Sequence, residues 1–283
     1  MKTLKRILAA TTLLVTLGFA SEANAQVPLE NFFKNPEKAG YQISPDGKYF
    51  SYMAPYENRL NLFVQEVGSD KATRITSETV RDLAGSMWAN GHRILYIKDT
   101  AGDENFQLYG VNVDGTDSKA YTAFPKVRTT IIDPLENIDS LVIIGLNKRN
   151  PQVFDPYRLN LNNGELTQLA ENPGNIQGWM TDHNGKLRVA LAIVDGVNTQ
   201  ILYRETEEQP FRPVLTTNFK ETVSFATFTP DNKMVYALTN IGRDKTALVL
   251  MDPATCEEKE VLYTNDKYLS LIHISEPTRP EPI

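Results

Sequence analysis

One short turn recurs along this chain, and its spacing limits the possible folds more than any other feature of the sequence. The turn combines Asp or Asn with Gly, Pro or Lys, as in Ser44-Pro45-Asp46-Gly47-Lys48. Its equivalent positions are Asp46, Asn90, Asn184 and Asn232. The intervals between them are 44, 94 and 48 residues, and the middle one is twice 47. Gly, Asn and Asp suit such turns because they tolerate positive φ.

The segments between these turns carry strand signals, which are short alternating or apolar runs bounded by Gly, Pro, Asn and Asp. The expected strands are 49–54, 62–67, 72–76, 93–98, 107–113, 119–122, 140–146, 157–161, 165–170, 247–251 and 260–264. A period in the mid-forties with about four strands per unit is typical of a β-propeller blade. A β-sandwich does not usually repeat one unit five times. The sequence therefore predicts an all-β fold, a partial β-propeller of about five four-stranded blades.

The first residues have the features of a secretory signal peptide. Lys2, Lys5 and Arg6 form a positive segment, an apolar stretch follows, and Ala23-Asn24-Ala25 fits a cleavage site. The apolar stretch is shorter than the ~20 residues that a membrane span needs. We therefore expect residues 1–25 to be removed after Ala25 and the protein to be periplasmic or secreted.

The mature chain would comprise an incomplete propeller domain over residues 26–268, with a short helix at 29–38. From Leu269 the sequence changes character. Residues 269–279 match, codon for codon, the translation of a common transposase sequencing adapter. We expect residues 269–283 to be an adapter-derived tail rather than a natural proline-rich terminus, so Ser270, His273, Ser275 and Glu276 carry no functional argument.

The charge balance argues against two classes of partner. The formal net charge is −6, and it becomes −8 without the signal segment, which carries three positive charges and one negative charge. Nucleic acid and anionic membrane surfaces both require clustered Lys and Arg. No basic run appears in the sequence. We therefore expect neither nucleic acid nor, after signal cleavage, a membrane as partner.

Two motifs stand out within the repeated units. One is Asp99-Thr100-Ala101-Gly102-Asp103-Glu104-Asn105, followed by Leu108-Tyr109, and the other is residues 43–48. Both resemble the blade motifs of S9 (prolyl oligopeptidase family) serine peptidases. Residues 150–160 and Gly178-Trp179 also look like blades of that family. The resemblance extends over about 29–268, but the Ser-Pro-Asp-Gly-Lys motif is also shared by TolB-like propellers.

The resemblance implies the substrate-gating propeller of an exported peptidase of the dipeptidyl, acylaminoacyl or prolyl oligopeptidase kind. In that family a propeller caps an α/β-hydrolase domain, and the seven or eight blades usual there would make five blades a truncated ring. The implied partners are peptide substrates and the missing hydrolase domain, so this chain alone should be inactive. A periplasmic propeller that binds a protein or cell-wall ligand remains the alternative. A metal-dependent lactonase would need converging acidic or amide ligands, and nothing in the sequence marks them.

The sequence offers no catalytic residue of its own. A Ser-His-Asp enzyme of this kind needs a nucleophile on a G-x-S-x-G turn, and the chain has none. His92 and His183 lie in predicted blade turns, where surface exposure explains them, and His273 lies in the tail. No cofactor and no metal are predicted.

Three polar features suggest chemistry but have simpler interpretations. Asp99, Asp103 and Asn105 have the near-alternate spacing of calcium ligands, yet the full loop with its bidentate Glu is absent, which favours a solvated loop. Glu207-Glu208 resembles the acidic pair with which dipeptidyl peptidases of the family bind an amino terminus, but a solvated turn is the favoured interpretation. Cys256, the only cysteine, is expected to be structural.

Bulky aromatic residues near the predicted strands are expected to pack between blades rather than to bind ligands. These residues are Trp88, Trp179, Phe225 and Phe228.

Overall fold

The computed structural model describes residues 27–34 and 37–265. The predicted signal peptide, its cleavage site and the adapter-like tail lie outside the described residues. Contacts divide the chain into Met1–Pro36 and Glu37–Ile283. In the first unit, Leu29–Phe32 forms a single 3₁₀ turn, η1, instead of the predicted helix over 29–38.

Within the described residues, no helix is both long and apolar enough to cross a membrane.

Residues 39–263 form five four-stranded sheets, which we call blades 1 to 5. Blade 1 contains β1 (Ala39–Ile43), β2 (Tyr49–Tyr56), β3 (Arg59–Glu66) and β4 (Ala72–Arg74). Blade 2 contains β5 (Gly85–Asn90), β6 (Arg93–Lys98), β7 (Gln107–Asn112) and β8 (Lys119–Ala120). Blade 3 contains β9 (Thr129–Asp133), β10 (Leu141–Asn150), β11 (Val153–Asn160) and β12 (Leu166–Gln168). Blade 4 contains β13 (Ile176–Thr181), β14 (Leu187–Val194), β15 (Asn198–Tyr203) and β16 (Arg212–Thr217). Blade 5 contains β17 (Val223–Phe228), β18 (Val235–Thr239), β19 (Ala247–Met251) and β20 (Glu258–Tyr263).

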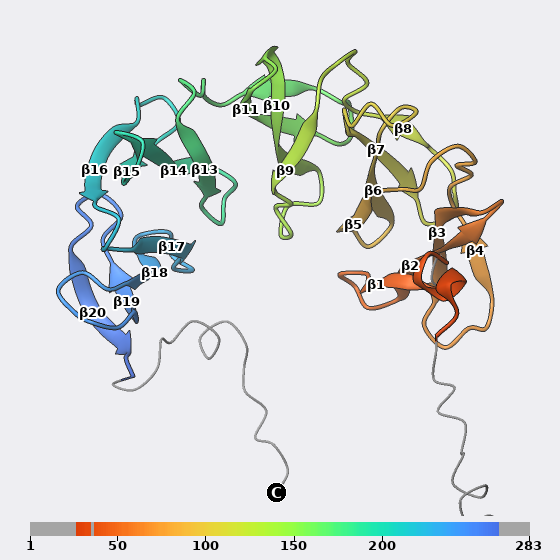
Figure 1. Cartoon of the computed structure of the whole chain (residues 1–283), viewed down its shortest axis with the longest axis horizontal. Coiled ribbons are helices and arrows are strands. Elements are labelled where there is room, and N and C mark those ends of the chain that lie inside the picture. The colour runs from red at the N-terminus through yellow and green to blue at the C-terminus, as the bar shows by residue number, and fades with distance from the viewer. Residues whose placement is uncertain (1–26, 35–36, 266–283) are drawn as a thin grey trace, which may run out of the picture. The chain divides into compact units, whose positions relative to one another are not determined.

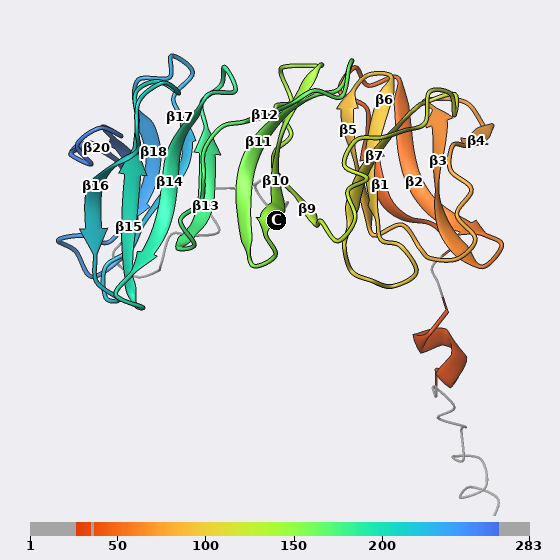
Figure 2. The same ribbon diagram turned by 90° about the horizontal axis from the view of Figure 1, so that it is seen from above.

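Every blade is an antiparallel meander in which neighbours in sequence are neighbours in the sheet. Within the unit 37–265 the blades follow one another around a common centre, and the first strand of each lies nearest to it (Figure 1). Figure 2 shows the strands of each blade along their length. The predicted all-β architecture and partial propeller are thus confirmed. The first strands of the blades, which precede the recurring turns, were not predicted as separate strands.

The recurring turn is held by the same hydrogen bonds wherever its Ser or Thr is present. Ser44 Oγ donates to Asp46 Oδ1 at 2.7 Å and accepts the Tyr49 amide at 2.9 Å. In blade 5, Thr229 Oγ1 makes the equivalent bond to Asp231 at 2.6 Å. A short polar side chain that bonds its own backbone replaces a strand hydrogen bond at the turn. The turn therefore joins the first two strands of a blade through local chemistry, which explains why it is visible in the sequence.

Buried apolar side chains join three of the four neighbouring pairs of blades. Leu62 and Val64 of blade 1 pack with Trp88 and Ile94 of blade 2, and a second cluster joins blades 2 and 3. A third cluster includes Phe228, which is 1% exposed, and joins blades 4 and 5. The predicted packing role of Trp88 and Phe228 is confirmed, while Trp179 and Phe225 are half-buried on first strands of blades.

The outward faces of blades 1 and 5 have no neighbouring blade among the described residues. Strand residues alternate between faces, so the face of blade 1 opposite Leu62 and Val64 carries an aromatic ladder. The ladder contains Tyr41, Phe50, Tyr52 and Phe63, with centroid distances of 5.2 to 6.1 Å. The corresponding face of blade 5 carries the half-buried side chains Tyr236, Leu238, Leu248 and Leu250. Exposed apolar faces of this kind favour association with other surfaces.

We expect the chain in isolation to self-associate through these faces. Ile43, on β1, is 66% exposed, and Val80, in the link between blades 1 and 2, is 65% exposed. Replacing Ile43 with Lys should reduce the associated fraction in sedimentation velocity, because it places a charge on the outward face of blade 1. The matched Val80→Lys change should leave that fraction unchanged. A monodisperse monomer of the unmodified chain would contradict the expectation.

Candidate functional site

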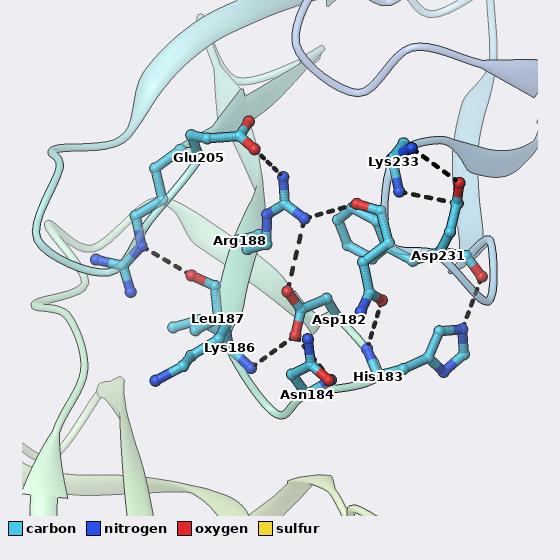
Figure 3. A network of polar contacts seen from close by, with 12 residues as sticks. Asp182, His183, Asn184, Lys186, Leu187, Arg188, Glu205, Asp231 and Lys233 are labelled. Atoms are coloured by element: carbon cyan, nitrogen blue, oxygen red, sulfur yellow. Dashed lines mark hydrogen bonds and ion pairs between the residues drawn. The ribbon is translucent and has the colours of Figure 1, made fainter.

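A buried arginine at the junction of blades 4 and 5 is the centre of a polar network (Figure 3). Arg188 lies on β14 and is 5% exposed. Its Nη1 donates to the Asn232 carbonyl of blade 5 at 2.8 Å, and Nη2 lies 3.0 Å from Glu205 Oε1. Nη1 also lies 3.5 Å from Asp182 Oδ2. The planar guanidinium, with five donors, suits such a site better than a lysine ammonium would.

Two aromatic rings complete the surroundings of Arg188. Its guanidinium carbon lies 5.3 Å from the ring centroid of Tyr203 and 4.9 Å from that of Phe228, within the range of cation–π attraction. Nη2 also donates to the Tyr203 hydroxyl, which in turn donates to Glu205. Burial, followed by the hydrogen bond to Glu205, raises the pKa of Tyr203 to about 12. The tyrosine is therefore a neutral donor and not a base at ordinary pH.

The turn before β14 positions the acidic partner and one histidine. Asp182 Oδ1 accepts the amides of Asn184 and Lys186, both at 3.0 Å. His183 donates its amide to Asn232 Oδ1 at 2.9 Å, and its Nε2 lies 2.9 Å from the Phe228 carbonyl. Because a carbonyl can only accept, Nε2 carries the hydrogen there. His183 and His92 are both exposed turn residues, as predicted.

This network can join two blades, but it does not present an activated nucleophile. The hydrogen bonds of His183 go to the Asn232 side chain and the Phe228 carbonyl of blade 5, and neither partner is a nucleophile. Cys256, far along the chain, has its pKa raised to about 11 by burial and then by Asp252, so it is not an activated thiol either.

We expect Arg188→Met to lower the free energy of unfolding by about 3 kcal/mol, because it leaves the buried Asp182 carboxylate without its cation. The change should be measured by urea denaturation at low protein concentration. Lys233→Met is the matched control, since Lys233 pairs with Asp231 at 3.8 Å on the exposed surface. Its effect should stay below about 0.5 kcal/mol. Equal effects of the two changes on the free energy of unfolding would contradict a stabilising role of the Arg188 network.

The structure corrects the interpretation of Glu207 as a solvated turn residue. Its side chain is 15% exposed, and Oε1 lies 2.7 Å from Arg158 Nη2 of blade 3. The same oxygen accepts the Leu187 amide at 3.0 Å, and Lys186 Nζ lies 3.7 Å from Oε2. Glu207 therefore links blades 3 and 4. The Glu207 carboxylate is already bound by Arg158 and the Leu187 amide, whereas the neighbouring Glu208 is exposed. The two glutamates therefore do not form an acidic pair that is available to a ligand.

The hydrogen-bond and ion-pair partners of Glu207 determine the pKa of its carboxyl group. Burial raises its pKa, but the hydrogen bonds from the Leu187 amide and from Arg158 outweigh burial and hold the pKa below its usual value. A carboxyl group whose pKa is lowered by folding stabilises the fold above its unfolded pKa. That contribution is lost as the pH falls through the lower, folded pKa.

We therefore expect the unfolding free energy of the unmodified chain to fall more steeply between about pH 5 and pH 3 than that of Glu207→Gln. Chemical denaturation at a series of pH values measures the difference. Glu136→Gln, at an exposed position, is the control and should follow the unmodified chain. Parallel curves for the Glu207→Gln variant and the unmodified chain would contradict the assigned role of Glu207.

The loop with the family motif also has structural partners. Asp99, 7% exposed, lies 3.5 Å from Arg81 Nε and accepts the Glu104 amide at 3.3 Å. Asp103 accepts the Thr100 and Asn105 amides, each at 3.1 Å. Among residues 27–34 and 37–265, no group of three or more His, Cys, Asp or Glu could hold a metal ion. The loop is thus held by its own hydrogen bonds, although Asp99 is more buried than a solvated loop predicts.

A cavity of about 330 Å³ lies beside the first strands of blades 3 and 4. Asp133, Glu136, Asp182 and His183 contribute to its wall. Asp133 accepts the Leu135 amide at 2.8 Å and the Thr181 hydroxyl. Asp133 and Asp182 already accept several hydrogen bonds, so neither carboxylate in this wall is free of partners.

The sequence did not reveal Arg188 or Arg158 as important residues. The partners of both arginines lie in the following blade or across a turn, so no spacing along the chain indicates them. The one local signal is a positive charge inside the apolar run of β14, where Leu187, Val189 and Ala190 are buried. A charge in such a run requires a partner.

Sequence comparison finds two peptidases as relatives. The chain is 31% identical over 239 residues to dipeptidyl aminopeptidase BIII of Pseudoxanthomonas mexicana, covering 81% of this chain and 34% of that protein. It is 27% identical over 272 residues to dipeptidyl peptidase family member 6 of Caenorhabditis elegans, covering 89% of this chain and 36% of that protein. The chain thus spans about a third of the length of these relatives. No protein-family profile matches it.

Structural comparison agrees on the fold. A prolyl endopeptidase structure matches with a TM-score of 0.58 at 13% identity, over 91% of this chain and 42% of that one. A likeness at this identity concerns the fold alone. Taken with the two sequence relatives, it supports an S9-type propeller-like region in this chain.

Proposed function

We propose that this chain is the propeller part of an exported S9-type serine peptidase and that it walls the active-site cavity of the intact enzyme. The observation that supports the proposal is the 31% identity to a dipeptidyl aminopeptidase over 239 residues. The matched region covers about a third of that protein, so a catalytic domain of the α/β-hydrolase type would lie beyond it. The substrates of the intact enzyme would be short peptides.

The described residues fit a gating role better than a catalytic one. His183, the half-buried Glu207 and the buried Asp99 bond to turns, links and neighbouring blades. A serine peptidase also needs a nucleophile with a base within hydrogen-bond reach, and the base oriented by a third group. Such a group would have to come from the proposed hydrolase domain.

Two experiments test the proposal in sequence. The first is to re-sequence the locus across the codon for Tyr268 by a method that uses no transposase adapter. A frame that runs through further blades into a G-x-S-x-G motif, with Asp and His after it, supports the peptidase. A genuine stop near this codon, with or without two more blades, overturns it in favour of a binding propeller.

The second experiment measures activity. The full reading frame should release p-nitroaniline from dipeptidyl-p-nitroanilides, and the present chain at equal concentration should not. Replacement of the serine in the G-x-S-x-G motif by Ala in the full-length protein is the control for contaminating peptidases. Turnover by the present chain alone would contradict the assigned division between propeller and catalytic domain.

A further inference from the structure

The junction between blades 3 and 4 differs from the other three junctions in its packing. Each of the others contains a cluster of buried apolar residues drawn from both blades. The corresponding cluster here consists of Ile176, Ala190 and Ala192, with Trp179, Leu202 and Phe211 packed against it. All six residues belong to blade 4. Among the described residues, no buried apolar cluster joins blade 3 to blade 4.

Two cavities lie where the missing apolar contacts would be. One, of about 450 Å³, is lined from blade 3 by residues that include Ile132 and Phe154 and from blade 4 by residues that include Ile176 and Trp179. The other, of about 360 Å³, lies along Trp179, Ala190, Leu202 and Phe211. Both cavities are open to solvent, so the side chains that line them contact water there and lose dispersion contacts with the facing blade. The apolar attraction between these two blades is correspondingly weak.

Small residues in the central strands explain the cavities. Blade 4 presents Ala190 and Ala192 of β14 on this side, and blade 3 has Gly145 in β10. A Cβ at Gly145 would lie 2.6 Å from Thr130 Oγ1 and 3.4 Å from Phe154 Cβ. Blade 3 therefore cannot fill the space from this position without moving its own side chains. The gap is built into both sheets.

Polar contacts hold this junction instead. Arg158 Nη2 of blade 3 donates to Glu207 Oε1 at 2.7 Å and to the Gly185 carbonyl at 2.9 Å, both in blade 4. The Thr181 hydroxyl of β13 donates to Asp133 of β9. Arg158 and Glu207 are 20% and 15% exposed at the side chain, so water reaches this pair. Hydrogen bonds that water can replace resist separation less than buried apolar area does.

We propose that the junction between blades 3 and 4 is a hinge, at which blades 1–3 and blades 4–5 move relative to each other as two packed bodies. Each body is held internally by its buried clusters. Opening breaks the contacts of Arg158 with Glu207 and Gly185 and that of Thr181 with Asp133. It exposes little additional apolar surface along the two cavities, where the facing side chains are already apart. Closing restores the polar contacts. The 169–175 segment between β12 and β13 carries the chain across the hinge.

Spin-label distances on the full chain test this proposal. Exposed positions in equivalent turns of four blades give three matched pairs, in a Cys256→Ser background. The pairs are Ser118–Asn163 for blades 2 and 3, Asn163–Gln209 for blades 3 and 4, and Gln209–Thr255 for blades 4 and 5. Excess unlabelled chain removes distances between molecules. We expect a single sharp distance for the outer two pairs and a broad or double distribution for Asn163–Gln209. Equal widths at all three junctions would overturn the hinge.

Two further variants separate a hinge from a labelling artefact. Glu207→Gln weakens the polar contact and should broaden only the Asn163–Gln209 distribution. Ala190→Leu fills the second cavity, along Trp179, Leu202 and Phe211, and should narrow the Asn163–Gln209 distance distribution. The matched change Ala237→Leu adds volume to the close-packed cluster between blades 4 and 5. It should narrow no distance distribution and should lower the melting temperature. Broadening by Glu207→Gln at every junction, or no response to either variant at the Asn163–Gln209 pair, would contradict the proposal.

Discussion

A β-sheet that is apolar on both faces needs cover on both, and this requirement governs the unit 37–265. Each blade covers the face of its neighbour. Leu62 and Val64 of blade 1, for example, are buried because Trp88 and Ile94 of blade 2 pack against them. The single cysteine rules out an internal disulfide as a substitute. The blades must therefore hold one another by non-covalent contacts, and the quality of each junction decides which parts of the unit act together.

The junctions meet this requirement in different ways. Blades 4 and 5 combine an apolar cluster with the Arg188 network, in which a buried cation satisfies Asp182 and Glu205 and packs against two rings. Blades 3 and 4 share no buried apolar cluster among the described residues and are joined by polar contacts around Arg158 and Glu207. A buried ion pair is costly to desolvate, and its value is often in specifying one arrangement rather than in adding stability. Each arginine donates to a backbone carbonyl in the recurring turn of the following blade, Arg158 to that of Gly185 and Arg188 to that of Asn232.

Local features of the fold could be predicted from the sequence, whereas contacts between blades could not. The strands 93–98 and 247–251 were predicted with the bounds that the structure shows, because their apolar runs are bounded by turn residues. The first strands β5 and β13 contain Gly85 or Gly178, which weakens their strand signal. The exposure of His92 and His183 followed from their turns. The burial of Glu207 did not, since Arg158 lies 49 residues away in the chain.

The residues that carry the family resemblance are mainly those that build turns and links. Asp46 accepts hydrogen bonds within its turn, and Asp99 and Asp103 organise the loop between β6 and β7. Such residues are required wherever this backbone is used, whatever chemistry takes place near it. Similarity at these positions therefore supports the fold more directly than it supports an activity. The peptidase proposal depends instead on the extent of the identity to a dipeptidyl aminopeptidase and on the coding sequence beyond Tyr268.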